Sequence, residues 1–489
     1  MPHNMDKLFT ELDRLYHRHN TRRHFLRHCS TGLGMAALST LVGCDFAPAP
    51  AQLGAKSSPI AKAKRVIFLH MAGAPSQLEL FDYKPELAKL DGQDCPPSLL
   101  AGKRFAFIEG VPKMLGPQAL FKQRGQSGAW ISDLLPHLAQ QADELTILKA
   151  CHTDQFNHAP AQLLLHTGSA QLGRSGLGSW ISYGLGSEND NLPAFVVLVS
   201  GGAKPSAGKS LWGSGFLPTV HQGVQCRGKG DPVLYVSDPH GMPRDLRGRT
   251  IEAINRLNEE QYQEVGDPEI LTRIQQYEMA YRMQVSVPKV MDITDEPAYI
   301  HQLYGSEPGK ASFANNCLLA RKLVENGVRF VQLFDWGWDM HGTAADVSLG
   351  EAGLVMKCRE TDRPISALII DLKQRGLLED TLIVWGGEFG RTPMQENREG
   401  LTNPYKGRDH HTEAFTVWMA GAGCRAGYIH GETDEIGFYG VEGRVHVHDL
   451  QATLLHQLGI DHEELTYPFQ GRDFRLTDVS GKLINEVLA

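Results

Sequence analysis

The chain has 489 residues and a formal net charge of −8, with 42% hydrophobic and 21% charged residues. These values are ordinary for a soluble globular protein, and the mildly acidic balance argues against a nucleic-acid partner, which requires a basic face. The 21 histidines are the one compositional excess, and they favour a metal site weakly, because histidine is the commonest metal ligand.

The first 44 residues are predicted to be an export signal. Arg22 and Arg23 precede two bulky apolar residues, and a modest apolar run over residues 31–42 follows. This order is typical of a twin-arginine signal, which would deliver the folded protein to the periplasm or cell envelope. The run is too short and too rich in small residues for a convincing membrane span, and an amphipathic N-terminal helix is the alternative.

Two ways of processing this signal remain open. The run ends in Leu-Val-Gly-Cys, which resembles a lipoprotein box with Cys44 as the lipidated residue. Ordinary peptidase cleavage within residues 47–55 is the other route. Residues 45–63, rich in Ala, Pro, Ser and Lys, are typical of a linker. Contact with a membrane is therefore expected only through the signal or a lipid anchor.

Residues 64–489 are predicted to form one α/β domain with a mostly parallel central sheet and helices on both faces. Short apolar runs typical of buried strands alternate with helical patterns of ten or more residues. Residues 201–310 interrupt this alternation and are predicted to be an inserted cap over the sheet. The apolar runs are residues 65–70, 144–150, 194–200, 328–334, 381–387 and 414–421.

Carboxylates and imidazoles lie next to five of these runs. Functional groups gather at the carboxyl ends of parallel strands, so the sequence predicts that they converge. Such ligands suit zinc, manganese, magnesium or iron. Each residue taken alone is more typical of a loop cap than of a metal ligand, so the prediction depends on all five strand ends together. Glu388 could instead pair with Arg391 or Arg408. The candidates are His70, His152, Asp154, His158, Asp335, Asp339, His341, Glu388, Asp409, His410 and His411.

Several segments resemble an exported bacterial family, domain of unknown function 1501, within the alkaline phosphatase and sulfatase superfamily. They include "FLHMAGAPSQLELFD", "LLLHTGS", "WDMHG", "GGEFGRTP", "GRDHHTEAFTVWMAGAG" and "VHDLQATLLHQLGID". The resemblance covers nearly everything after the leader. It implies an alkaline-phosphatase-like fold and metal-dependent hydrolysis of phosphate or sulfate esters.

The resemblance also implies roles for individual residues. The segments "DMHGT" and "HT" imply that Asp339, His341 and His411 bind one ion. The segments that contain His70 and Glu388 imply that these two residues bind a second ion or share the first. On an extended segment neighbours point opposite ways, so His410 is expected to point away.

Where sulfatases carry a nucleophilic Cys or Ser, "HAPAQLLLHTG" has His158, which becomes a metal ligand or an acid/base group. With no hydroxyl or thiol at that position, water activated by the metal would be the attacking group.

The sequence therefore predicts an exported, metal-dependent hydrolase-like protein with one or two divalent ions (zinc, manganese or magnesium). Its substrate would be a small-molecule or polysaccharide ester. The alternative is a non-catalytic, metal-stabilised exported protein that binds a polysaccharide or a protein partner.

Overall fold

The computed structural model describes residues 61–228, 232 and 243–489. The predicted signal, with Arg22, Arg23 and Cys44, lies outside these residues, as does most of the predicted linker. By its internal contacts the chain divides into two units, and residues 245–277 belong to the smaller one. This unit contains nearly all of helix α8 (Arg244–Val265) and the first part of α9 (Pro268–Met291).

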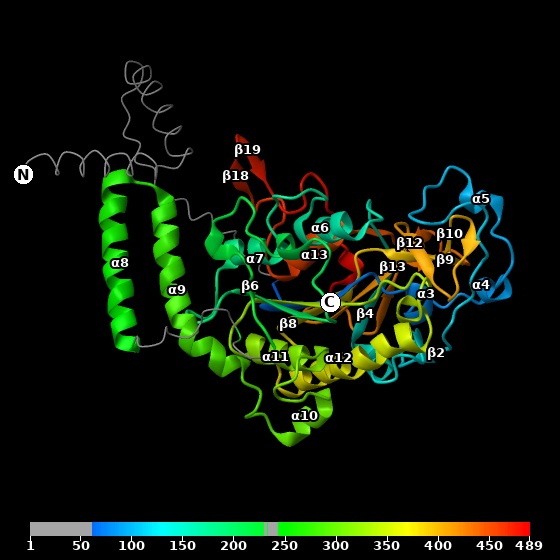
Figure 1. Cartoon of the computed structure of the whole chain (residues 1–489), viewed down its shortest axis with the longest axis horizontal. Coiled ribbons are helices and arrows are strands. Elements are labelled where there is room, and N and C mark those ends of the chain that lie inside the picture. The colour runs from blue at the N-terminus through cyan, green and yellow to red at the C-terminus, as the bar shows by residue number, and fades with distance from the viewer. Residues whose placement is uncertain (1–60, 229–231, 233–242) are drawn as a thin grey trace, which may run out of the picture. The chain divides into compact units, whose positions relative to one another are not determined.

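The larger unit is built on a nine-stranded sheet in the order β14-β4-β13-β8-β1-β7-β5-β6, with β17 paired to β4 (Figure 1). At its centre β1 pairs in parallel with both β7 and β8, as the sequence predicts. The strands are β1 (Arg65–Ala72), β4 (Leu145–His152), β5 (Phe195–Ser200), β6 (Val224–Gln225), β7 (Phe330–Trp336), β8 (Thr381–Gly386), β13 (Phe415–Gly421), β14 (Tyr428–His430) and β17 (Val445–His446).

Helices cover both faces of this sheet, so alternate residues of β1 pack into two different hydrophobic cores. Ile67 and Leu69 pack in one cluster with residues of α11 and α12, whereas Val66 and Phe68 pack in another with residues of α6, α7 and α13. The helices of the larger unit are α3 (Gln77–Leu80), α4 (Pro85–Lys89), α5 (Pro97–Leu100), α6 (His158–Thr167), α7 (Leu177–Leu185), α10 (Ala298–Tyr304), α11 (Phe313–Glu325), α12 (Met356–Gln374) and α13 (Val447–Gln457). The predicted α/β class with a mostly parallel sheet is confirmed.

One strand departs from the predicted direction. β13 runs antiparallel to both of its neighbours, β4 and β8. The residues that precede β13 therefore lie at the same sheet edge as the carboxyl ends of β1, β7 and β8. Small antiparallel ladders supplement the sheet: β2 (Phe121–Arg124) with β3 (Ala129–Ser132), β9 (Gly390–Gln395) with β12 (Arg408–His411), β10 (Asn397–Arg398) with β11 (Leu401–Thr402), β15 (Glu432–Thr433) with β16 (Gly440–Glu442), and β18 (Tyr467–Phe469) with β19 (Arg472–Phe474).

The predicted insertion over residues 201–310 is not one body. Within it β6 joins the main sheet beside β5, whereas residues 245–277 form part of the smaller unit. Its role as a cap stays a prediction. None of the helices in the part of the chain that the structure describes combines the length and the apolar character needed to span a bilayer.

Candidate metal centre

The candidate site lies where four elements meet at one edge of the sheet. Asp339 and His341 follow β7, and His158 is the first residue of α6. His410 lies on β12, which the ladder with β9 brings to this edge through the pairing of His410 with Arg391. The antiparallel direction of β13 makes this arrangement possible, because β12 comes directly before β13 in the chain.

Three imidazole nitrogens converge on one carboxylate oxygen. The Nε2 atoms of His341, His158 and His410 lie 2.7, 3.2 and 3.3 Å from Oδ1 of Asp339. The Nε2 atoms of His341 and His410 are 3.2 Å apart. One ligand atom from each of the four residues lies within 4.8 Å of every other.

A separate acceptor holds the other nitrogen of each of these rings. His158 Nδ1 lies 2.7 Å from Oε1 of Glu388, and His410 Nδ1 lies 2.6 Å from the carbonyl oxygen of Phe156. His341 Nδ1 contacts a carboxylate oxygen of Glu396. With a proton on each Nδ1 donated to these acceptors, the three Nε2 atoms are the nitrogens left to bind an ion beside Asp339. Histidine ligands of metals are commonly fixed in this way.

These four residues fit a divalent ion. An ion with four ligands at about 2.0–2.1 Å in tetrahedral geometry separates its donor atoms by about 3.3–3.4 Å. The distances of the three Nε2 atoms from Asp339 Oδ1 and of His341 Nε2 from His410 Nε2 lie between 2.7 and 3.3 Å, and all four donor atoms lie within 4.8 Å of one another. His158 Nε2 is buried and forms no hydrogen bond with the described residues, although it faces Asp339. Three imidazoles and one carboxylate suit zinc, manganese or iron.

The charges at the cluster are strongly coupled. Burial alone would raise the pKa of Asp339, but the Arg391 guanidinium, 2.6 Å from Oδ1, and the three histidines outweigh burial and lower that pKa. Burial lowers the pKa of His410 to about 3. Burial would also lower the pKa of His158, but Asp339 and Glu388 raise it to about 9. A metal ion would therefore have to displace a proton from His158 at neutral pH.

Glu388 lies behind His158 rather than among the converging atoms. Its carboxylate is fully buried and accepts hydrogen bonds from Gln162 Nε2 at 2.9 Å and from the backbone N–H of Gly73 at 3.1 Å. His70 Nε2, also fully buried, lies 3.3 Å from its other oxygen. The sequence predicts Glu388 and His70 as direct ligands of an ion, and this stays a prediction. In the structure Glu388 contacts Nδ1 of His158, His70 contacts Glu388, and neither belongs to the four-residue cluster.

The alternative ion pairs considered for Glu388 do not form. Arg391 contacts Asp339, and Arg408 forms a buried ion pair with Glu79 at 2.7 Å. Glu388 is held by His158 instead, at the N-terminus of α6. The carboxylate at the end of this buried strand therefore has an imidazole partner, not a guanidinium partner.

The two adjacent histidines take the opposite orientations to those expected. His410 Nε2 faces the cluster, whereas His411 Nε2 lies 2.5 Å from the carbonyl oxygen of Phe438. The rule that neighbours on a strand point opposite ways holds, but the sequence does not reveal which of the two points inward. The structure thus brings Asp339, His341 and His158 together as predicted, and adds His410 in place of His411.

Sequence reasoning also missed a carboxylate next to the cluster. Glu396 contacts His341, and one ligand atom each from His341, Glu396 and Asp409 lies within 4.8 Å of the others. Asp409 accepts hydrogen bonds from the backbone N–H groups of Phe107 and Ile108, at 2.8 and 3.0 Å. Asp409 is adjacent to the paired histidines in the sequence, but Glu396 follows no apolar run and carries no comparable signal.

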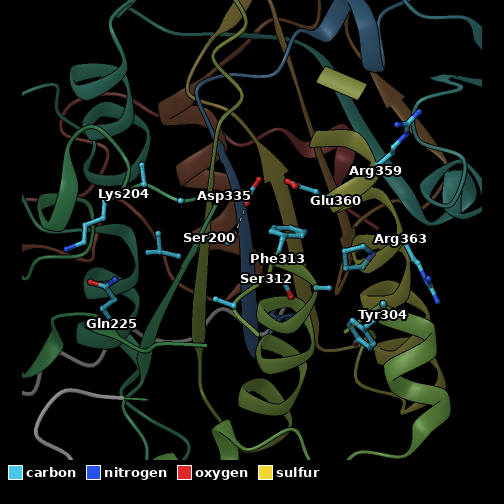
Figure 2. A pocket seen from close by; sticks show the side chains of 18 residues that line it. Ser200, Lys204, Gln225, Tyr304, Ser312, Phe313, Asp335, Arg359, Glu360 and Arg363 are labelled. Atoms are coloured by element: carbon cyan, nitrogen blue, oxygen red, sulfur yellow. Dashed lines mark hydrogen bonds between the residues drawn. The ribbon is translucent and has the colours of Figure 1, made fainter. Parts of the chain in front are cut away.

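A cavity of about 950 Å³ opens farther along the same sheet edge, beside the ends of β5 and β7 (Figure 2). Asp335, a candidate ligand from sequence, faces this cavity and accepts hydrogen bonds from Ser200 Oγ at 2.7 Å and Lys357 Nζ at 2.6 Å. Another candidate, Asp154, lies 3.2 Å from His446 Nε2. Neither carboxylate belongs to the four-residue cluster.

Comparison with known proteins assigns the family. Residues 63–488 match the model of the family described as "Protein of unknown function (DUF1501)". No curated protein matches the sequence.

Several solved structures resemble the chain at low identity. Alkaline phosphatase from the Antarctic bacterium TAB5 is 10% identical over 82% of this chain and 99% of its own, with a TM-score of 0.34. The PsFucS1 sulfatase from Pseudoalteromonas sp. is 12% identical over 82% and 69%, with a TM-score of 0.36. The lipoteichoic acid synthase LtaP from Listeria monocytogenes is 9% identical over 86% and 78%, with a TM-score of 0.35. At these values no activity or ligand is carried over to this chain.

Proposed function

The chain belongs to the DUF1501 family, and on that premise we propose that it is a metal-dependent hydrolase of phosphate or sulfate esters. The observation that carries this proposal is the convergence of three Nε2 atoms on Asp339, each from a histidine whose Nδ1 has its own acceptor. Such paired fixation prepares imidazoles to bind an ion.

Each residue of the centre has a definite task. His158, His341, His410 and Asp339 would hold the ion, and Glu388 and Glu396 keep two of the rings in the required tautomer. A bound divalent ion would polarise an ester oxygen and supply activated water at neutral pH. Because the Asp339 side chain is 27% exposed and that of His158 14%, a substrate can approach from this side.

Arg391 partly neutralises the negative charge of Asp339 through an ion pair. Its guanidinium donates to Asp339 and to the backbone carbonyl oxygens of Ala74 and Arg408, at 2.6, 2.9 and 3.0 Å. The arginine is thereby fixed in place and fully buried. It fixes the position of the Asp339 carboxylate relative to the three imidazoles.

One observation favours the second candidate, a non-catalytic protein with a metal-stabilised fold that binds a polysaccharide or protein partner. Four protein ligands fill the shell of a tetrahedral zinc ion and leave no place for water. The residue at the start of α6 is, moreover, a histidine and not a hydroxyl or thiol nucleophile. Catalysis at this centre therefore requires an ion that accepts a fifth or sixth ligand.

The test is metal analysis of purified protein, followed by hydrolysis of p-nitrophenyl phosphate and p-nitrophenyl sulfate after loading with zinc, manganese, iron or magnesium. The hydrolase proposal predicts turnover with at least one ion and its loss in the His341→Ala variant. Tight metal binding without turnover of either ester by any form would favour the second candidate. A protein that takes up none of these ions would contradict both.

We also propose export by the twin-arginine route, which the pair Arg22 and Arg23 supports. Lysine does not replace the guanidinium fork, so Arg22→Lys combined with Arg23→Lys should leave the protein in the cytoplasm. Cys44→Ala should release the exported protein from membranes if the cysteine is lipidated. Normal export of the double variant would refute the proposal.

A further inference from the structure

Two phenylalanines contact histidines of the candidate metal centre. The Phe107 ring is half-buried and stands edge-on to the rings of His341 and His410, with centroids 5.0 and 5.5 Å apart. Phe156, also half-buried, contacts the centre through its carbonyl oxygen, which accepts the hydrogen bond from His410 Nδ1. Phe107 thus contacts two histidines of the centre with its ring, whereas Phe156 contacts His410 through its backbone.

An arginine lies on each of these two rings. The guanidinium carbon of Arg398 is 3.9 Å from the centroid of Phe107, and that of Arg104 is 5.3 Å from the centroid of Phe156. A guanidinium stacked on a ring is held by its face, so that the N–H groups at its edge stay free to bind. Phe107 therefore positions Arg398 next to the centre, and Arg104 is positioned on the ring of a residue whose backbone contacts His410.

Both guanidinium groups retain unused donors. Arg398 donates from Nε to Glu396 at 2.6 Å, and within the described part of the chain its two terminal nitrogens have no acceptor. Arg104 is exposed and has no acceptor among the described residues. Glu396 offsets part of the charge of Arg398, whereas Arg104 forms no ion pair with any residue that the structure describes. Free guanidinium forks match the oxygens of sulfate, phosphate and carboxylate groups.

We infer that the guanidinium groups of Arg104 and Arg398 each bind anionic oxygens of the substrate other than those of the ester that is cleaved. This inference rests on the proposed function. It narrows the substrate class to esters with at least two anionic groups, as in a sugar that carries two phosphates or two sulfates. A substrate with a single anionic group would leave both arginines without a partner.

The cavity in Figure 2 also carries cationic side chains, Lys204, Arg359 and Arg363, but none of them contacts the four-residue cluster. Its arginines have partners: Arg359 forms an ion pair with Glu351 at 3.1 Å, and Arg363 donates to the carbonyl oxygen of Leu303 at 3.2 Å. Figure 2 also shows both side chains directed away from Asp335. This difference makes Arg359 a matched control for Arg104, because both side chains are exposed and carry the same charge.

The experiment is calorimetric titration of the metal-loaded full chain with fructose 6-phosphate and fructose 1,6-bisphosphate. A mono- and a disulfated disaccharide form the second arm, which distinguishes phosphate from sulfate. The wild-type protein should bind the doubly charged member of at least one pair about tenfold more tightly or better, as expected for charge-assisted hydrogen bonds. Arg104→Gln should remove most of this advantage and leave the affinity for the singly charged sugar unaffected, whereas Arg359→Gln should keep the advantage. Arg398→Gln should also remove most of it.

Equal affinities for both members of both pairs would overturn the inference, as would an advantage lost in Arg359→Gln but kept in Arg104→Gln. Metal content is measured for each variant, because Arg398 contacts Glu396 and could act through His341. A chain that takes up no metal contradicts the proposed function. The arginines are still tested in that case, because the same sugars are titrated into the metal-free protein.

Discussion

Replacement of Glu388 by glutamine tests how the centre is organised. The carboxylate accepts from His158 at 2.7 Å, and its burial leaves no water to substitute for it. The amide is nearly the same size, so the change removes a charge and the strong acceptor for His158 Nδ1 with little loss of packing. Changing such an orienting residue typically lowers metal affinity 10- to 100-fold, or about 1.4–2.7 kcal/mol.

The assay is a metal titration against a chelator of known affinity, combined with thermal unfolding at fixed metal concentration. The rise in melting temperature on adding metal should shrink in Glu388→Gln, because a ligand stabilises the folded state according to its affinity. Glu413→Gln, which removes a partly exposed carboxylate paired with Arg444, is the matched control and should behave as wild type. Unchanged affinity in Glu388→Gln would refute the orienting role. A loss well beyond 100-fold would instead make Glu388 a direct ligand.

Three further predictions concern other residues. His410→Ala should abolish or strongly reduce metal binding, whereas His411→Ala should leave metal content unchanged; equal losses would contradict the orientations found here. Arg408→Met leaves the fully buried carboxylate of Glu79 unpaired and should cost about 3–5 kcal/mol in the free energy of unfolding, measured by urea denaturation. Burial lowers the pKa of His221 to about 4, so the unfolded chain takes up a proton first as pH falls. The stabilisation from neutral His221 is complete above about pH 6.5 and is lost toward pH 4. The free energy of unfolding of the wild-type protein should therefore fall more steeply over this range than that of His221→Gln. Equally steep falls in the two proteins would refute the contribution of His221.

Much of the fold is predictable because its signals are local. Apolar runs separated by helical patterns give the α/β class, and the parallel pairing of β1 with β7 and β8 agrees with the expectation. The direction of β13 is not predictable in this way, because an apolar run looks the same in a parallel and an antiparallel strand. That direction nevertheless decides on which edge His410 lies.

The candidate site is predictable in its location but not in its detail. Strand ends identify Asp339, His341 and the sheet edge, because polar groups there interrupt buried segments. Which of His410 and His411 faces inward depends on the register of β12 with β9. These two strands pair with each other outside the main sheet, so the apolar pattern of the main-sheet strands does not give their register. The position of Glu388 behind His158 depends on where α6 begins. No local sequence pattern gives the distance between the Glu388 carboxylate and the His158 ring.

The central claim is that His158, Asp339, His341 and His410 hold one ion. Anomalous diffraction from crystals of metal-loaded protein, recorded at the absorption edge of the bound metal, tests it most directly. The arrangement of ligand atoms predicts one peak about 2.0–2.2 Å from the three Nε2 atoms and from Asp339 Oδ1. A peak bonded to His411 and Glu388, or none within reach of these four residues in a protein shown to contain metal, would contradict the claim.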